Sequence, residues 1–110
     1  MSDKGKPSFY KKFGKKFPEV ADAVEKLGTT LRTAGPLDEK TSQLIQLAAA
    51  AAEHSEGSVC SHTRRALQAG ATPEEISHTL LLLVSTIGFP RTLAALSWSL
   101  KLMEKIVKEK

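Results

Sequence analysis

Apolar residues recur at helical spacing in the stretch "PEVADAVEKLGTTLRT", which starts at Pro18. These positions lie three or four residues apart and so share one face of a helix: Val20, Val24, Leu27 and Leu31. Pro18 suits the first position of a helix, and the glutamate behind it places an acid in the first turn. The pattern predicts an amphipathic helix over residues 18–33.

Two more helices follow the break "AGPLDEK". Asp38 is the expected N-cap for "EKTSQLIQLAAAAAEHS", because its carboxylate can accept a hydrogen bond from the first turn. The alanines Ala48–Ala52 give this helix a high helical propensity and a thin profile, so another helix can approach it closely. The next segment runs from Gly57 to Ala69 and ends at Gly70, which suits a left-handed C-cap.

The clearest local signal is "ATPEEISHTLLLLV". Thr72 as N-cap, Pro73 at the first position and Glu75 at the third predict a capping box. The leucines that follow point in all directions around the axis, so protein must cover this helix, residues 74–87, on both sides. Gly88 ends it, and a last helix, "PRTLAALSWSLKLMEKIVKEK", begins at the next proline. We expect an all-α fold of about five helices joined by short turns.

The formal charge of +4 is concentrated at the start of the chain. Residues 1–18 hold six lysines against one acid, whereas the other 92 residues hold ten basic and eleven acidic side chains. A nucleic-acid surface would carry its basic residues across the folded body, so we expect no nucleic-acid partner. The predicted division is a basic N-terminal arm, residues 1–16, followed by one helical domain, residues 17–110. Aromatic residues in and beside the arm are expected to anchor it: Phe9, Tyr10, Phe13 and Phe17.

A single cysteine excludes an intrachain disulfide and any CxxC motif, and it fits a reducing cytosol. The apolar run "ISHTLLLLVSTIGF" is too short to span a membrane. The lysine-rich start lacks the apolar segment of a signal peptide. We therefore expect a soluble, cytoplasmic protein with no membrane partner.

The candidate chemistry lies in "EHSEGSVCSHTRRAL". On one helix Cys60 and His62 stand about 200° apart, so they cannot form a thiolate–imidazole pair, and Cys60 is more simply a small packing residue. Ser58 and His62 share a face, with Ser55 one turn further back, and this is the polar cluster that could act chemically. His54 and His62 would be about 12 Å apart along a helix, so we expect no metal site.

The stretch "HTRRALQAGATPEEI", followed by "LLLVSTIGFPRTLAAL", resembles the signature of the carboxymuconolactone decarboxylase and alkylhydroperoxidase-D-like family. In that signature a histidine opens an H-x-x-x-A-x-x-x-G-A-x-x-E-E-I run, and an apolar helix then ends in a G-x-P turn. "FPEVADAVEKL" and "GPLDEKTSQLIQLAAAAA" also resemble the first helices of the family, so the likeness covers residues 10–105. The resemblance implies a helical domain that works without a cofactor and forms homo-oligomers, either trimers or hexamers.

The peroxidase branch of the family has a C-x-x-C-x-x-x-H pattern, preceded by a glutamate that relays protons. In this sequence the two cysteines of the pattern fall at Ser55 and Ser58, and its histidine is His62. The position of the glutamate is occupied by Gln43. Serine forms no disulfide, and glutamine transfers no proton near neutral pH, so the dithiol cycle is expected to be absent. The decarboxylase branch needs no CxxC and keeps the histidine and the G-x-P turn, so this site resembles that branch more closely. His78 departs from both branches, which commonly have an acid there.

Two functions from different classes remain open. In the first, His62 moves a proton to or from a small organic acid, lactone or hydroperoxide, which Ser58 and Gln43 orient by hydrogen bonds; any peroxidase activity would use Cys60 as its nucleophile. In the second, the chain is a non-catalytic oligomeric scaffold or small-ligand binder that has lost the redox site, and neighbours satisfy His62.

Three other residues could serve either structure or function. Arg91 follows the G-F-P turn and could bind a carboxylate in a pocket, although a solvated surface charge is the simpler interpretation. Trp98 and His78 are expected in the core or at a subunit interface.

Overall fold

The computed structural model describes residues 8–109, and residues 1–7 and 110 lie outside the described part. Within residues 8–109 every regular element is a helix, which confirms the all-α fold. The helices are α1 (Ser8–Lys16), α2 (Pro18–Arg32), α3 (Glu39–Ala52), α4 (Glu56–Gln68), α5 (Pro73–Leu81), α6 (Val84–Ile87) and α7 (Phe89–Glu109). None of these described helices combines the length and the apolar composition that a membrane crossing needs.

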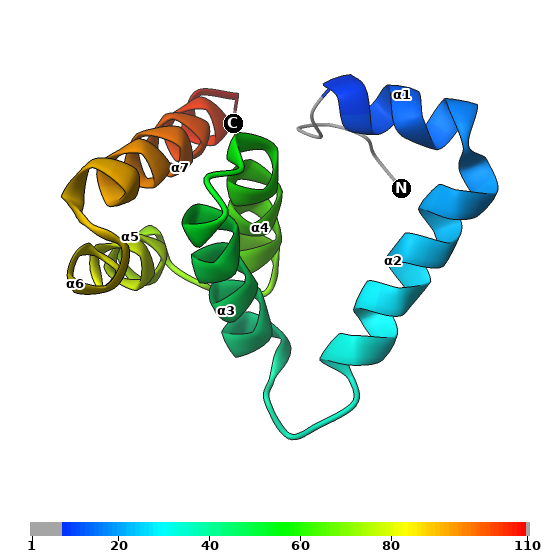
Figure 1. The fold of residues 1–110 in the computed structure, drawn as a ribbon, viewed down its shortest axis with the longest axis horizontal. Helices are drawn as coiled ribbons and strands as arrows, with labels where there is room; N and C mark the ends of the chain where they lie inside the picture. Colours follow the sequence, from blue (N-terminus) through cyan, green and yellow to red (C-terminus); the bar gives the residue numbers. More distant parts are fainter. Residues whose placement is uncertain (1–7, 110) are drawn as a thin grey trace.

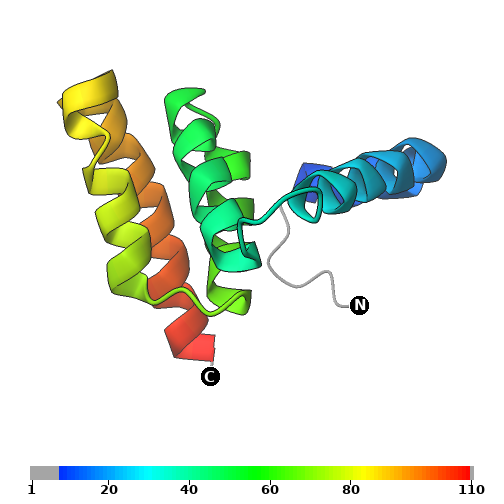
Figure 2. The ribbon, with the colours of Figure 1, turned by 90° about the horizontal axis from the view of Figure 1, so that it is seen from below.

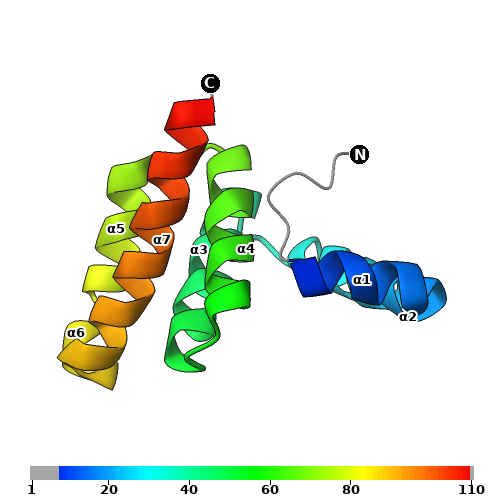
Figure 3. The same cartoon turned by 90° about the horizontal axis from the view of Figure 1, so that it is seen from above.

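Helices α3–α7 pack into one body, whereas α1 and α2 extend away from it (Figure 1). In the body, α3 and α4 form one layer and α5 and α7 form the other (Figure 2). The view from the opposite side shows α1 and α2 as a separate lateral projection, joined to α3 by a short connection (Figure 3). We call α3–α7 the body and α1–α2 the N-terminal unit.

The core of the body is built from small and medium apolar side chains of four helices. Its fully buried members include Leu47 on α3, Val59 on α4, Leu80 on α5 and Ala95 on α7. Two alanines of the predicted thin helix, Ala50 and Ala51, are buried, and α3 packs most extensively against α4, as the alanine run predicted. Close approach of two helices needs small side chains at the contact, and the alanines supply them.

Two buried hydroxyls lie between α4 and α7. Thr63 and Ser99 are completely buried, and their Oγ atoms are 2.8 Å apart, so each satisfies the other. Thr92, at the start of α7, is 1% exposed, and its hydroxyl has no hydrogen-bond partner among the described residues. A buried hydroxyl without a partner loses its hydration without compensation, so Thr92 is a weak point of the body.

The predicted capping signals are confirmed at three helix ends of the body, the N-termini of α3 and α5 and the C-terminus of α4. The Asp38 carboxylate accepts from Thr41 N–H at 2.8 Å, and Thr72 with Glu75 forms the complete capping box. Gly70 follows α4 with a φ of 99°, the left-handed conformation that glycine tolerates best. Local sequence rules therefore account for these three helix ends.

The continuous helix predicted for residues 74–87 is wrong, because α5 ends at Leu81 and the short α6 starts at Val84. Leu83 N–H bonds the carbonyl of Leu80, three residues back, and this tighter turn redirects the chain. The four residues of α6, "VSTI", are weak helix formers, which favours the break. Leu81 stays 56% exposed, so this part of the body does not cover its leucines on both sides.

The described part of the predicted basic arm, residues 8–16, is helix α1, and the rest of that arm lies outside the described residues. The aromatic anchoring predicted here is only partly seen. The rings of Phe13 and Phe17 lie 5.4 Å apart at the junction of α1 and α2, whereas Phe9 is 74% exposed. α1 packs against α2 rather than against the body.

Candidate functional site

His62 lies in the middle of α4, with its ring half-buried beside α3. Its Nδ1 is 2.8 Å from Oε1 of Gln43, a residue of α3 that is only 1% exposed. The two residues that the family pattern singled out, 19 positions apart in sequence, are therefore in direct contact. Packing of α3 against α4 makes this contact possible.

A carboxylate on the far side of Gln43 fixes how the amide is oriented. Gln43 Nε2 donates to Oε2 of Glu39 at 2.8 Å, one helical turn earlier on α3. A carboxylate only accepts hydrogen bonds, so the NH₂ group must face Glu39 and the amide oxygen must face His62. Nδ1 of His62 then carries the proton and donates it to the amide oxygen. The Nε2 atom is left with its lone pair and makes no hydrogen bond within residues 8–109.

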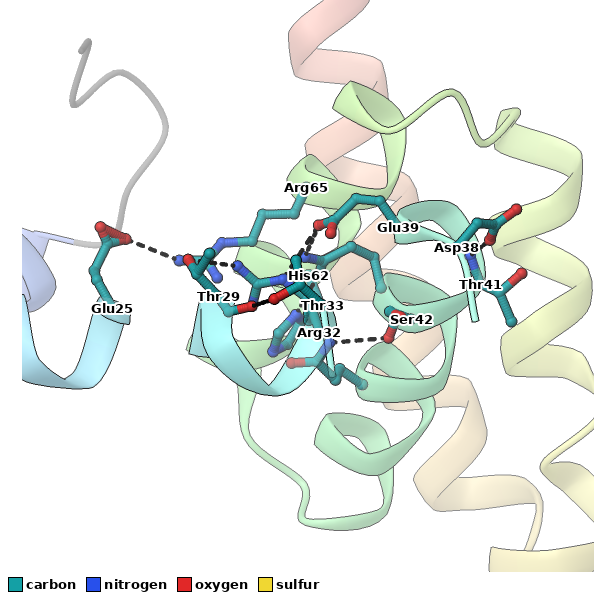
Figure 4. A network of polar contacts seen from close by, with 12 residues as sticks. Glu25, Thr29, Arg32, Thr33, Asp38, Glu39, Thr41, Ser42, His62 and Arg65 are labelled. Atoms are coloured by element: carbon teal, nitrogen blue, oxygen red, sulfur yellow. Dashed lines mark hydrogen bonds and ion pairs between the residues drawn. The ribbon is translucent and has the colours of Figure 1, made fainter. Parts of the chain in front are cut away.

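Two arginines from different helices extend this network (Figure 4). Nε of Arg32, at the end of α2, lies 3.2 Å from Oε2 of Glu39, in an ion pair that lacks the alignment of a hydrogen bond. Arg65 on α4 pairs with Glu25 on α2 at 3.5 Å. These pairs tie the N-terminal unit to the body beside His62.

The surroundings of His62 disfavour its protonated form. Burial, together with the smaller effects of the positive charges of Arg65 and then Arg32, lowers the pKa of His62 from 6.5 to about 4. At neutral pH the ring is therefore uncharged. A neutral imidazole with one protonated and one free nitrogen can accept a proton at Nε2 or orient a polar group there.

The serines of the predicted polar cluster do not join His62. Ser55 is the N-cap of α4, and its hydroxyl accepts from Ser58 N–H at 3.4 Å. Ser58 is exposed, and no hydrogen bond links it to His62 within residues 8–109. The helical phase that placed Ser55, Ser58 and His62 on one side of α4 overlooked that Ser55 precedes the helix. A serine immediately before "EGSV" was a signal for this N-cap.

Cys60 is half-buried and makes no disulfide. Burial raises the pKa of its thiol, the Glu56 carboxylate raises it further, and Arg64 acts in the opposite direction. The sulfur is therefore held as the neutral thiol, the less nucleophilic form.

The other two histidines serve elsewhere. His54 follows α3 with a φ of 57°, and its ring lies 5.2 Å from that of Trp98. Trp98 packs against the core of the body, as expected. His78 is exposed on α5 and so lies outside the core of the chain, which leaves the subunit interface as the other place predicted for it. Arg91 is exposed too, with Nη1 3.4 Å from the carbonyl of Ala52.

Glu39, Arg32 and Arg65 were missed as site residues by sequence reasoning. Glu39 could have been found, because it precedes Gln43 by four residues and side chains at that spacing share a helix face. Arg32 and Arg65 could not, because their position depends on how α2 lies beside α3 and α4 (Figure 4). Within residues 8–109 no group of three His, Cys, Asp or Glu side chains is arranged to hold a metal ion.

A hollow of about 280 Å³ lies in the elbow between α1 and α2. Its polar lining includes Tyr10, Lys11, Lys15, Asp22 and Glu25. Glu25 is the partner of Arg65, but His62 and Gln43 do not line this hollow. The hollow therefore adjoins the outer end of the polar network rather than its histidine.

Known proteins share this sequence and this fold. Residues 18–101 match the sequence profile of the Carboxymuconolactone decarboxylase family. Two uncharacterised proteins of Methanocaldococcus jannaschii are similar in sequence to this chain. The first, MJ0742, is 32% identical over 92 residues, which cover 83% of this chain and 85% of that protein. MJ1511 is 33% identical over 81 residues, which cover 74% of this chain and 76% of that protein.

A solved structure is also similar, that of apo-lpg0406, a carboxymuconolactone decarboxylase family protein from Legionella pneumophila. It superposes with a TM-score of 0.72 at 32% sequence identity, and the match covers 86% of this chain and 83% of that one. The chain therefore belongs to the carboxymuconolactone decarboxylase family.

Proposed function

We propose that this protein is a cofactor-free acid–base catalyst acting on a small organic acid or lactone, with His62 as the group that moves the proton. The observation that carries the proposal is the chain from Glu39 through Gln43 to His62, which leaves Nε2 as a free proton acceptor. Gln43 and Glu39 act as positioning residues, because both ends of the amide are already bonded within the protein.

A decarboxylation at this site would balance as follows. The substrate binds as its carboxylate, and Nε2 of His62 takes up a proton from the solvent. The C–C bond breaks, CO₂ leaves, and the electron pair remains on the carbon. The imidazolium then gives its proton to that carbon, so the enzyme ends unchanged. Arg32 and Arg65 stabilise the negative charge that develops on the substrate, because their charges already act on the His62 ring.

Peroxidase chemistry is less well supported. It would need Cys60 as a single-cysteine nucleophile, and the raised pKa of this thiol lowers its thiolate fraction. Serines stand where a dithiol would be needed, and one of them, Ser55, is occupied as an N-cap.

The test compares turnover of a panel of small lactones and carboxylic acids, followed by CO₂ release, in the wild type and two matched variants. His62→Gln should lower kcat at least about 100-fold, because the proton acceptor is lost. His78→Gln, at an exposed histidine on α5, should leave the rate unchanged. Equal rates for wild type and His62→Gln would refute the proposal. Peroxide consumption that falls in Cys60→Ser would revive the peroxidase interpretation.

The second candidate function is a non-catalytic oligomeric scaffold or small-ligand binder. The observation that favours it is the large apolar surface of α2, none of whose residues is buried in the chain. An assembly with no turnover of any panel substrate, with or without His62, would favour this function.

A further inference from the structure

Helix α1 concentrates positive charge that the rest of the chain does not neutralise. Residues 8–17 hold four lysines and no acid, whereas residues 19–110 hold ten basic and eleven acidic side chains. The four lysines are exposed: Lys11, Lys12, Lys15 and Lys16. No acidic side chain of residues 8–109 forms an ion pair with any of them. Their charge is therefore available to a partner outside the chain.

The phenylalanines of the same segment form one stripe along the helix. Phe9, Phe13 and Phe17 follow each other at four-residue spacing, so they lie within about 80° of one another around the axis. Phe17 N–H bonds the carbonyl of Phe13, so the helical path continues to Phe17. Phe9 is 74% exposed and Phe17 is 48% exposed. The stripe is thus an apolar edge that residues 8–109 leave largely uncovered.

The stripe faces away from α2, beside which α1 projects from the body (Figure 3). The residues of α1 that line the elbow hollow mark its α2 side: Tyr10, Lys11, Gly14 and Lys15. At about 100° per residue, Phe9 and Phe13 point about 150° away from the mean direction of these four residues. Lys12 and Lys16 lie within about 60° of Phe9 on the same outer side. The outer face of α1 therefore presents two phenylalanines bordered by two lysines.

This combination is typical of a helix that lies in the surface of a membrane. Phenylalanine rings enter the boundary between headgroups and acyl chains, while the long stems of lysines keep their ammonium groups among the headgroups. Lysines clustered on an amphipathic helix complement the phosphates of anionic lipids. Such a helix needs neither the length nor the all-round apolar composition of a crossing helix, so the shortness of the apolar runs in this chain does not disfavour it.

We propose that α1 binds the surface of membranes that contain anionic phospholipids, with Phe9 and Phe13 in the interface and Lys12 and Lys16 against the phosphates. Apolar contact and charge act together, and the charge makes the binding sensitive to salt. A single-stranded nucleic acid fits less well, because bases stack on separately accessible rings, whereas the Phe13 ring lies against that of Phe17. This inference is independent of the proposed catalysis.

Cosedimentation of the full chain with vesicles tests the charge. The wild type should bind vesicles of phosphatidylcholine with about one third phosphatidylglycerol at least about tenfold more tightly than vesicles of phosphatidylcholine alone. The double variant Lys12→Glu with Lys16→Glu should lower the affinity for the anionic vesicles at least about tenfold. The matched control is Lys101→Glu with Lys105→Glu, at exposed lysines of the same spacing on α7, and it should change that affinity by less than about twofold.

Tryptophan fluorescence tests whether the apolar stripe enters the membrane. Phe9→Trp, compared with the wild type and its single Trp98, should show a blue-shifted emission on anionic vesicles. Val107→Trp, at a 71% exposed position near the end of α7, should show no added shift. Phe9→Ser should weaken binding to the anionic vesicles about tenfold, because the ring no longer leaves water.

Three results would overturn the proposal: no binding of the wild type to anionic vesicles, equal losses for the lysine pairs of α1 and α7, or an unshifted spectrum of Phe9→Trp. Binding of poly-deoxythymidine as tight as that of the anionic vesicles, with vesicle affinity unchanged by Phe9→Ser, would assign α1 to single-stranded nucleic acid instead.

Discussion

The body and the N-terminal unit are both made of amphipathic helices, yet they differ in what those helices bury. In the body, every helix longer than one turn contributes at least two buried residues to a shared interior. In α2, fifteen residues form a regular helix with none buried. The local patterns are equally clear in both regions, so amphipathic spacing predicts a helix but does not say which molecule covers its apolar face.

The two regions also differ in how they meet the polar site. The body supplies the buried partner pair, Gln43 and His62, through the packing of α3 on α4. The N-terminal unit supplies charge, with Arg32 and Glu25 paired across its boundary with the body. The body therefore supplies the hydrogen-bonded pair of the site, and the N-terminal unit supplies part of the charge around it.

The largest expected effect separates the two regions by stability. Leu80→Ala, at a fully buried leucine of α5, should lower the free energy of unfolding by about 2–5 kcal/mol. Leu27→Ala, at a 58% exposed leucine of α2, should change it by less than about 0.5 kcal/mol at protein concentrations low enough to prevent association. Urea denaturation at submicromolar concentration measures both. Comparable losses would mean that α2 is part of the folded core after all.

Within the body, removing the buried hydroxyl of Thr63 and removing that of Thr92 should change the free energy of unfolding in opposite directions. Thr63→Val leaves the hydroxyl of Ser99 without its partner and should cost about 1–3 kcal/mol. Thr92→Val removes a buried hydroxyl that has no partner and keeps the shape, so it should stabilise the body by about 1 kcal/mol. Thermal unfolding of both variants checks the pair. A loss on Thr92→Val would show that its hydroxyl is satisfied.

The ends of α3 and α4 offer a smaller, matched test. Both helices end in the same hydrogen-bond motif, with His54 and Gly70 at the left-handed position. Gly70→Ala should therefore destabilise the body by about 1 kcal/mol, and His54→Gly should stabilise it by a similar or smaller amount. The second effect is reduced because the contact of His54 with Trp98 is lost. Denaturant midpoints compare the two variants.

The smallest expected effect concerns pH and the junction between the two regions. The pKa of folded His62, about 4, lies below its ordinary value of 6.5, so the unfolded chain binds the proton more readily between these values. Stability is therefore full above pH 6.5 and falls as the pH drops toward 4, by an amount on the order of 1 kcal/mol because the half-buried ring stays partly solvated. His62→Gln should flatten this part of the pH–stability curve. A curve unchanged by the substitution would contradict the low pKa.

Removing Arg32 or Arg65 tests how much each charge contributes to the low pKa of His62. Because its charge contributes less to the shift than burial and Arg65 do, Arg32→Ala should raise the pKa of His62 only slightly, and Arg65→Ala should raise it more. Titration of the His62 ring signals by NMR measures both. The reverse order would place the N-terminal unit closer to the histidine than the structure does.

The fold was largely predictable from the sequence, whereas the site was predictable only in part. His62 and Gln43 followed from the family pattern, and the helix phase kept Cys60 apart from His62. Glu39 was within reach of the same rules, since it lies one turn before Gln43. Ser55 and Ser58 were grouped with His62 because the N-cap role of Ser55 was overlooked.

The sequence by itself determined the helices and most of their limits, because caps, prolines, glycines and apolar spacing act within a few residues of each other. It also determined that no dithiol can form, since that depends only on which residues are present. Only the tertiary structure decided that Gln43 fixes the tautomer of His62, that burial and two arginines lower its pKa, and that the apolar side chains of α2 stay exposed in this chain. These features arise where separate helices meet, and the angle and position at which helices pack are set by side chains distant in sequence.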